Sequence, residues 1–128
     1  MILKAQNKLE STIILRLDEI FWQLDDAAKM DRKFREALKK SLDERGMLWP
    51  PIVWTQETFL QYYNENPRRQ DPTKPVDIDY HWRCAIGNNR LEYAKLSGYT
   101  SIECVIAERW QDKDRILSVT QMEYRRDF

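Results

Sequence analysis

The segment of this sequence with the clearest potential for chemistry is the turn Gly87-Asn88-Asn89-Arg90. It follows a short run of alternating apolar residues and opens a stretch with helical spacing. The first backbone N–H groups of a helix have no partners within it and carry partial positive charge, so they attract anions. Gly87 permits close backbone approach, the asparagines can donate amide hydrogens, and Arg90 offers a fork of donors suited to phosphate. We therefore predict an anion-binding turn.

A purely structural reading of the same residues stays open. Asn is a preferred N-cap residue, so Asn88 or Asn89 can serve only to cap the helix while Arg90 faces solvent. Arg83, in the strand before the turn, can reach the same anion or be simply exposed. His81, the only histidine, shares that strand face and is either an acid–base group or a solvent-facing residue.

Hydrophobic spacing predicts the elements that position this turn. We expect strands at residues 12–17, 52–54, 81–86 and 101–107, and helices at residues 31–45, 56–63, 88–96 and 112–126. Asp31 is placed to lead the first helix, and Gly46 and Gly98 suit the left-handed position just past a helix end. This alternation of strands and helices predicts one mixed α/β domain over residues 1–128, with an irregular, exposed insert at 64–79.

The net charge and the lengths of the apolar runs limit the classes of function and partner that we expect. The 128 residues carry a formal net charge of zero, which gives no support for strong non-specific binding to nucleic acid. The small basic cluster Arg68, Arg69 and Lys74 is offset by nearby aspartates, so DNA is only a weakly supported partner. No apolar run reaches the length of a membrane span or of a signal peptide, and we expect a cytoplasmic protein with no membrane partner.

The two cysteines, Cys84 and Cys104, both lie in alternating apolar patterns. Together with one histidine they do not form a zinc ligand set of familiar spacing. We expect buried, reduced thiols, and we assign no metal-ligating residues.

Two longer segments resemble motifs of the ParB/sulfiredoxin superfamily. Residues 41–53 resemble its first motif, where a helix ends in glycine and leads through a proline to a strand. Residues 87–106 resemble its second motif, where Gly-Glu-Arg-Arg opens a helix that ends before a strand. The resemblance covers about residues 12–107. It implies a small α/β domain with helices packed around a short mixed sheet, and a bound nucleotide: CTP in the chromosome-partitioning members and ATP in sulfiredoxin.

The resemblance also implies roles for individual residues. Gly87 and Arg90 match the phosphate-loop positions, and Gly46 with Pro50 or Pro51 matches the turn that faces the loop. Asn88, however, stands where partitioning proteins have an acidic residue for hydrolysis and where sulfiredoxins have their reactive cysteine. We therefore expect no sulfiredoxin activity, and no catalytic residue is identified.

Two other departures bear on function. Trp49 or Pro50 replaces the glutamine usually found before the first-motif proline, so recognition of the base does not carry over. The chain ends at Phe128 without a helix-turn-helix domain, so we expect no sequence-specific partitioning role. A stand-alone domain of this kind suits a phage or mobile element by analogy.

These observations lead to one main functional hypothesis and two alternatives. The main hypothesis is a ParB-like domain that binds ATP or CTP with Mg²⁺ and has NTPase, phosphotransfer or nuclease activity. Its phosphate-binding residues are Gly87, Asn88, Asn89, Arg90, Gly46 and Arg83. One alternative is a non-catalytic module that keeps the fold and binds a protein partner. The other is a nuclease that grips DNA through the basic residues of the insert.

Overall fold

The structure, a computed structural model, describes residues 1–7, 11–24 and 32–125. Its strands are β1 (Ile2–Leu3), β2 (Thr12–Arg16), β3 (Ile20–Phe21), β4 (Ile52–Thr55), β5 (Trp82–Ile86) and β6 (Ser101–Ile106). Its helices are α2 (Arg32–Arg45), α3 (Gln56–Glu65), α4 (Asn88–Leu96) and α5 (Trp110–Arg125), with short 3₁₀ turns at Leu17–Glu19 and Pro67–Arg69. No helix in these ranges is both long enough and apolar enough to cross a membrane.

The strands form one mixed sheet in which β6 has three partners. β6 pairs antiparallel with β2 and parallel with both β1 and β4. β5 in turn pairs antiparallel with β4 and parallel with β3. The predicted α/β class with a short mixed sheet is therefore confirmed. The strands β1 and β3 were not predicted, because two residues are too few to show an alternating pattern.

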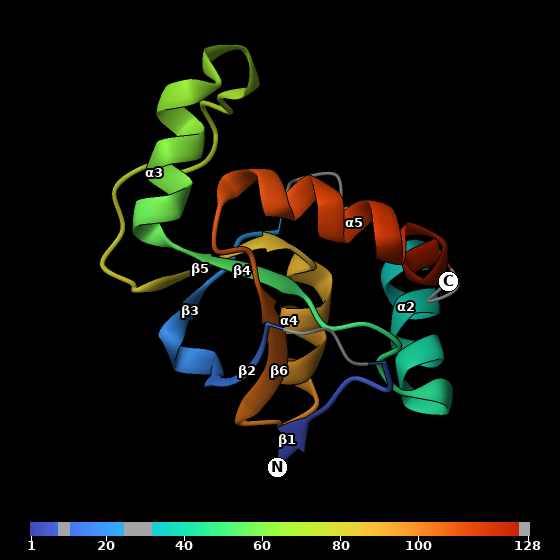
Figure 1. The fold of residues 1–128 in the computed structure, drawn as a ribbon. Helices are drawn as coiled ribbons and strands as arrows, with labels where there is room; N and C mark the ends of the chain where they lie inside the picture. The colour runs from blue at the N-terminus through green and yellow to red at the C-terminus, as the bar shows by residue number, and fades with distance from the viewer. Residues whose placement is uncertain (8–10, 25–31, 126–128) are drawn as a thin grey trace.

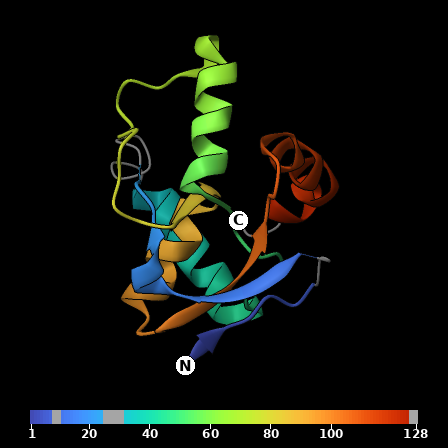
Figure 2. The same ribbon diagram turned by 60° about the vertical axis from the view of Figure 1, so that its left-hand side comes forward.

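Helices cover both faces of the sheet (Figure 1). On one face, Val53 of β4 packs in a hydrophobic cluster with residues of α2 and α4. On the other face, its neighbours Ile52 and Trp54 pack with residues of α3 and α5. This division follows from the strand geometry, since successive side chains point to opposite faces. Figure 2 shows that the far end of α3 extends away from the sheet.

The predicted helices agree closely with those observed. The helix predicted at residues 88–96 is α4, with the same bounds. The helix predicted from residue 31 is described from Arg32, and both Asp31 and the predicted last helical residue, Arg126, lie outside the described residues. Gly46 and Gly98 adopt φ of 76° and 82° just past α2 and α4, as predicted for helix C-termini.

The insert is largely irregular and exposed, as predicted. The first two residues of the insert, 64 and 65, belong to helix α3, which ends at Glu65 and not at residue 63 as predicted. The remainder, up to residue 79, contains only the 3₁₀ turn and passes over the edge of the sheet before β5 (Figure 1).

Candidate anion-binding site

The predicted turn connects β5 directly to α4 and requires glycine for two reasons. Gly87 is the N-cap of α4, with a left-handed φ of 107° that L side chains rarely adopt. A Cβ atom at this position would also lie 2.8 Å from the Cβ of Pro51, just before β4. The turn is thus packed against the residue that leads into the neighbouring strand.

The first turn of α4 has two backbone donors for which the described residues supply no acceptor. The N–H groups of Arg90 and Leu91 both donate to the carbonyl of Gly87, over 3.0 and 3.3 Å. Among the described residues, no acceptor is found for the N–H of Asn88 or Asn89. These two groups lie at the positive end of the helix, where an anion is most favoured.

Neither asparagine caps α4, contrary to the capping alternative. No side chain caps α4, because the N-cap residue is glycine. The side-chain oxygen of Asn88 instead accepts the backbone N–H of Gln23 over 3.3 Å, which ties the segment after β3 to the turn. The alternative that Arg90 is solvated is also wrong, since its side chain is only 5% exposed.

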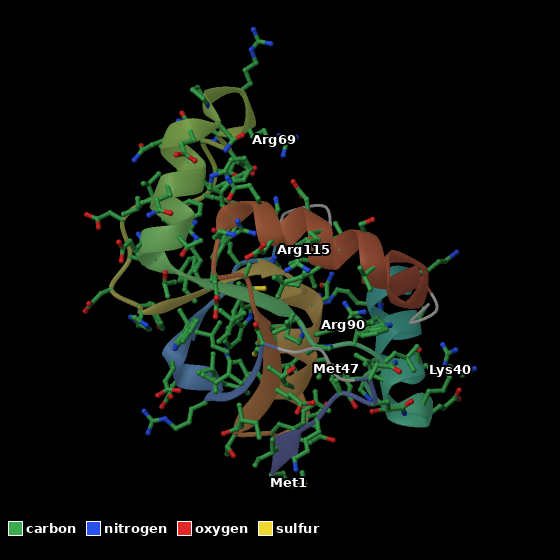
Figure 3. The ribbon with its side chains drawn as sticks, viewed as in Figure 1. Met1, Lys40, Met47, Arg69, Arg90 and Arg115 are labelled. Carbon is green, nitrogen blue, oxygen red and sulfur yellow. The ribbon has the colours of Figure 1, made fainter. Side chains whose placement is uncertain are left out.

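A cavity of about 320 Å³ opens at this turn. Its lining combines the turn with residues from three distant parts of the chain, and comprises Gln23, Leu24, Leu38, Lys74, Ala85, Ile86, Gly87, Asn88, Asn89 and Arg90. The lining contains two cationic side chains, Lys74 and Arg90, and no carboxylate. Figure 3 shows Arg90 near the centre of the molecule, between the sheet and the helices. The cavity therefore has the charge and the donors of an anion site.

A second cavity of about 320 Å³ continues from the first between α2 and α4. Leu38 and Asn89 line both cavities. The second is lined on one side by Tyr93 and Leu96 of α4. The hydroxyl of Tyr93 donates to Oδ1 of Asp43 over 2.7 Å, which links α4 to α2 and fixes the ring beside the cavity.

The structure does not bring every predicted site residue to this place. Gly46 lines neither cavity, and a Cβ there would meet the side chain of Gln6 at 3.1 Å. Arg83 lines a different cavity, beneath α3 and α5. His81 is exposed and stacks edge-on against Trp82, as the solvent-facing reading predicted. The site is therefore built by Gly87, Asn88, Asn89 and Arg90 without Gly46 or Arg83.

Sequence reasoning assigned no site role to six residues of the lining, which are Gln23, Leu24, Leu38, Lys74, Ala85 and Ile86. Gln23 and Leu38 carried no local signal, because an ordinary amide and a helix leucine acquire a role only through tertiary packing. Lys74 was noted only as part of the basic cluster in the insert, yet it lies beside the turn.

The thiols and the carboxylates offer little further chemistry. Cys84 and Cys104 are free thiols, and burial raises the pKa of both, that of Cys84 to about 12. They are therefore protonated and unreactive at neutral pH. No group of three or more His, Cys, Asp or Glu residues in the described part of the chain is arranged to hold a metal ion. The cavity lining lacks the carboxylates that Mg²⁺ prefers as protein ligands.

Comparisons with known proteins find similarity at the level of solved structures. No family model and no curated protein matches the chain. A sulfiredoxin from Arabidopsis thaliana is 18% identical over 81% of this chain and 92% of that one, with a TM-score of 0.48. A C-terminally truncated chromosome-partitioning protein ParB from Caulobacter crescentus, complexed with CTP-gamma-S, is 16% identical over 88% of this chain, with a TM-score of 0.49.

The chain spans 54% of that ParB chain. The two structures come from the two protein groups that the sequence motifs resemble. Because both TM-scores lie below 0.5, we draw the function from this chain's own residues.

Proposed function

We propose that this domain binds a nucleotide and holds its phosphates at the turn Gly87–Arg90. The observation that carries the proposal is the cavity at the start of α4. Two backbone N–H groups without a protein acceptor among the described residues, those of Asn88 and Asn89, lie there with two cationic side chains and no carboxylate. Phosphate is the common biological anion that fits such a set of donors and charges.

The neighbouring cavity makes a nucleotide a better ligand than a small phosphate compound. Each cavity alone falls at the lower end of the usual size of ligand sites, and the two adjoin at Leu38 and Asn89, which line both. Tyr93 and Leu96 offer apolar surface against which a base or ribose can pack, and Glu36 and Glu92 offer acceptors for hydroxyl or amino groups. The buried side-chain oxygen of Gln23, beside the turn, has no hydrogen-bond donor in the described residues and can accept from such a group.

The proposal concerns binding and stops short of an assigned reaction. Asn88 has an amide where hydrolysis would need a carboxylate, and an amide does not act as a general base at neutral pH. The two thiols are held protonated by burial. NTP hydrolysis, phosphotransfer and DNA cleavage are therefore secondary assays, to be run once a nucleotide is found.

The test is a thermal-shift panel of ATP, CTP, GTP and ADP, each with and without Mg²⁺. A ligand at 100 times its Kd stabilises the native state by about 2.7 kcal/mol, which raises the Tm of a domain of this size by several degrees. We expect at least one nucleotide to give such a shift. Absence of any shift up to millimolar nucleotide would refute the proposal and favour the protein-interaction alternative.

The decisive variant is Asn89→Asp, because it moves stability and binding in opposite directions. A carboxylate in the first turn of a helix interacts favourably with the helix dipole, so the free protein should be as stable as the wild type or gain about 0.3–1 kcal/mol. The same charge at about 5 Å from a phosphate costs roughly 1–3 kcal/mol, so nucleotide binding should weaken about 5- to 150-fold.

Asn64→Asp is the matched control for this variant. Asn64 is exposed on α3 and lines neither cavity of the site, yet the substitution changes the net charge by the same amount. We expect it to leave the nucleotide shift unchanged. Equal loss of binding in both variants would mean that net charge, and not the turn, controls the response.

A further inference from the structure

A third cavity, of about 110 Å³, lies on the other face of β5, beneath α3 and α5. It is lined by one aromatic group and one charged group of side chains, together with Cys84 and Ala85. The aromatic residues are Trp54, Phe59, Tyr62 and Tyr63, and the charged residues are Arg69, Asp71, Lys74, Arg83 and Lys113. Four of the five charged side chains are cationic, so the cavity is strongly biased towards a negatively charged ligand.

Arg83 is the most unusual member of this lining. It is 4% exposed, and its guanidinium carbon lies 3.6 Å from the centre of the Phe59 ring and 5.4 Å from that of Phe21. Its Nη1 is buried, and the described part of the chain supplies it with no hydrogen-bond acceptor. A buried guanidinium is normally paired with a carboxylate or another acceptor, so Nη1 of Arg83 is suited to a hydrogen-bond acceptor that a ligand supplies.

The electrostatics of Arg83 agree with this reading. Burial lowers its pKa to about 10, so the side chain still carries its charge at neutral pH. The faces of aromatic rings offset part of the hydration that a buried cation loses. They do not accept the hydrogen bonds that the guanidinium N–H groups donate in the plane of the group.

Two further donors lie at the same cavity. The indole Nε1 of Trp54 is buried and also finds no acceptor within the described ranges. The Nζ of Lys113 lies 4.7 Å from the centre of the Tyr62 ring and 5.6 Å from that of Trp54, and its side chain is 15% exposed. Donors from β4, β5 and α5 therefore gather at one small cavity whose lining supplies few acceptors.

The carboxylates nearby offset only part of this positive charge. Asp71 accepts both the N–H and the hydroxyl of Thr73, over 2.9 and 2.6 Å, and its carboxylate also attracts Lys74. Asp114 lies 3.5 Å from both Arg69 and Lys113, at the outer edge of the cavity, and offsets part of their charge. Figure 3 shows Arg69 on the side of the insert that faces α5. No ion pair of Arg83 or Lys74 is found among the described residues, which leaves the inner part of the cavity positive.

We propose that this cavity is a second anion site, which binds a phosphate group through Arg83, Trp54 and Lys113. A phosphate has several acceptor oxygens in a tetrahedral arrangement and can meet donors that come from different elements, whereas a carboxylate has two oxygens in one plane. The volume is on the order of a few water molecules, which admits a phosphate group but not a whole nucleotide. Lys74 and Ala85 line both this cavity and the cavity at Gly87, so the two sites are neighbours across β5.

The indole N–H of Trp54 provides a readout specific to this cavity. We would titrate ¹⁵N-labelled protein with inorganic phosphate and follow the five tryptophan indole resonances by NMR, with sodium chloride at matched ionic strength as the salt control. Trp54→Phe identifies the resonance by its loss. We expect the Trp54 signal to move saturably with phosphate and to remain still with chloride. The Trp49 indole, which belongs to the lining of none of the three cavities, is the internal reference.

Lys113→Gln and Arg115→Gln form the matched pair of variants. Both remove one positive charge from neighbouring positions of α5, but Arg115 does not line the cavity. We expect Lys113→Gln to weaken the phosphate response of Trp54 by about tenfold or more, the usual effect of one charge-assisted contact, and Arg115→Gln to leave it unchanged. No movement of the Trp54 signal, equal movement with chloride, or equal effects of the two variants would each overturn the proposal.

The same experiment separates this inference from the nucleotide proposal and identifies the source of the phosphate. Asn89→Asp should leave the Trp54 response intact, and loss of the nucleotide shift alone would refute only the first site. If ATP displaces inorganic phosphate and moves the Trp54 signal itself, a phosphate of the bound nucleotide occupies the cavity. If ATP leaves the phosphate response unchanged, the occupant is a separate phosphate compound.

Discussion

Substituting Gly87 with alanine tests the geometry on which the anion site depends. The residue has φ of 107°, and a Cβ atom would lie 2.8 Å from Cβ and 3.1 Å from Cα of Pro51. The left-handed backbone costs an L residue roughly 1–2 kcal/mol. The contact involves the rigid ring and backbone of Pro51, so relieving it costs about 1–3 kcal/mol more, the usual range for overpacking.

The expected total is therefore about 2–5 kcal/mol, a large part of the roughly 5–15 kcal/mol by which a domain is stable. Urea unfolding followed by tryptophan fluorescence measures it directly. With a slope of about 1–3 kcal/mol per molar urea, the midpoint should fall by at least about 0.7 M.

Gly98→Ala is the control that isolates the contact with Pro51. Gly98 has a similar left-handed φ of 82°, but a Cβ atom there would meet nothing within 4 Å. We expect it to cost only the backbone contribution of about 1–2 kcal/mol. If Gly87→Ala proves no more destabilising than Gly98→Ala, the close packing of the turn on Pro51 is refuted, and with it the position assigned to the start of α4.

Two further predictions concern titration and thiol chemistry. Hydrogen bonds from Lys39 and, to a smaller extent, from Tyr93 hold the pKa of Asp43 below its usual value. This carboxylate therefore stabilises the fold at pH values above its unfolded-state pKa, and the contribution is lost as pH falls through the folded-state pKa. Tyr93→Phe should raise the pKa of Asp43 and destabilise the fold most near neutral pH, and the difference from the wild type should shrink as pH falls below about 4, as NMR titration and acid unfolding would show; an unchanged pKa would mean that the hydroxyl does not reach Asp43. For the thiols, burial raises the pKa of Cys84 to about 12 and also raises that of Cys104, which is fully buried. A thiol reagent at about pH 8 should therefore label Cys104 only when urea unfolds the chain. Rapid labelling of both thiols in the native protein would contradict the packing of β5 and β6.

Local sequence patterns determined the elements that are long enough to show a period. The helix at residues 88–96 and the glycine before it were predictable, because helical spacing and the conformational freedom of glycine act over a few residues. The two-residue strands β1 and β3 were not, since each exists only by pairing with β6 or β5, far away in the sequence. The start of the anion site was thus visible in the sequence, while the sheet that supports it was only partly so.

The rest of the candidate site was decided by tertiary structure. Alternation along β5 correctly placed Arg83 opposite Trp82 and Cys84, but it did not show that α3 and α5 cover that face as well. Arg83 is consequently buried beneath those helices instead of reaching the turn. Of the residues predicted to face the turn, Gly46 with Pro50 or Pro51, only Pro51 is placed against Gly87.

The sequence by itself therefore determined the glycine turn at the start of α4 and the α/β class, because both depend on short-range spacing and on the backbone freedom of glycine. Only the tertiary structure decided which side chains surround that turn and which face of β5 is covered. Lys74 and Leu38 meet Asn89 at one cavity although they come from an irregular insert and a separate helix. Such a meeting depends on how helices pack against the sheet, and no local pattern along the chain encodes it.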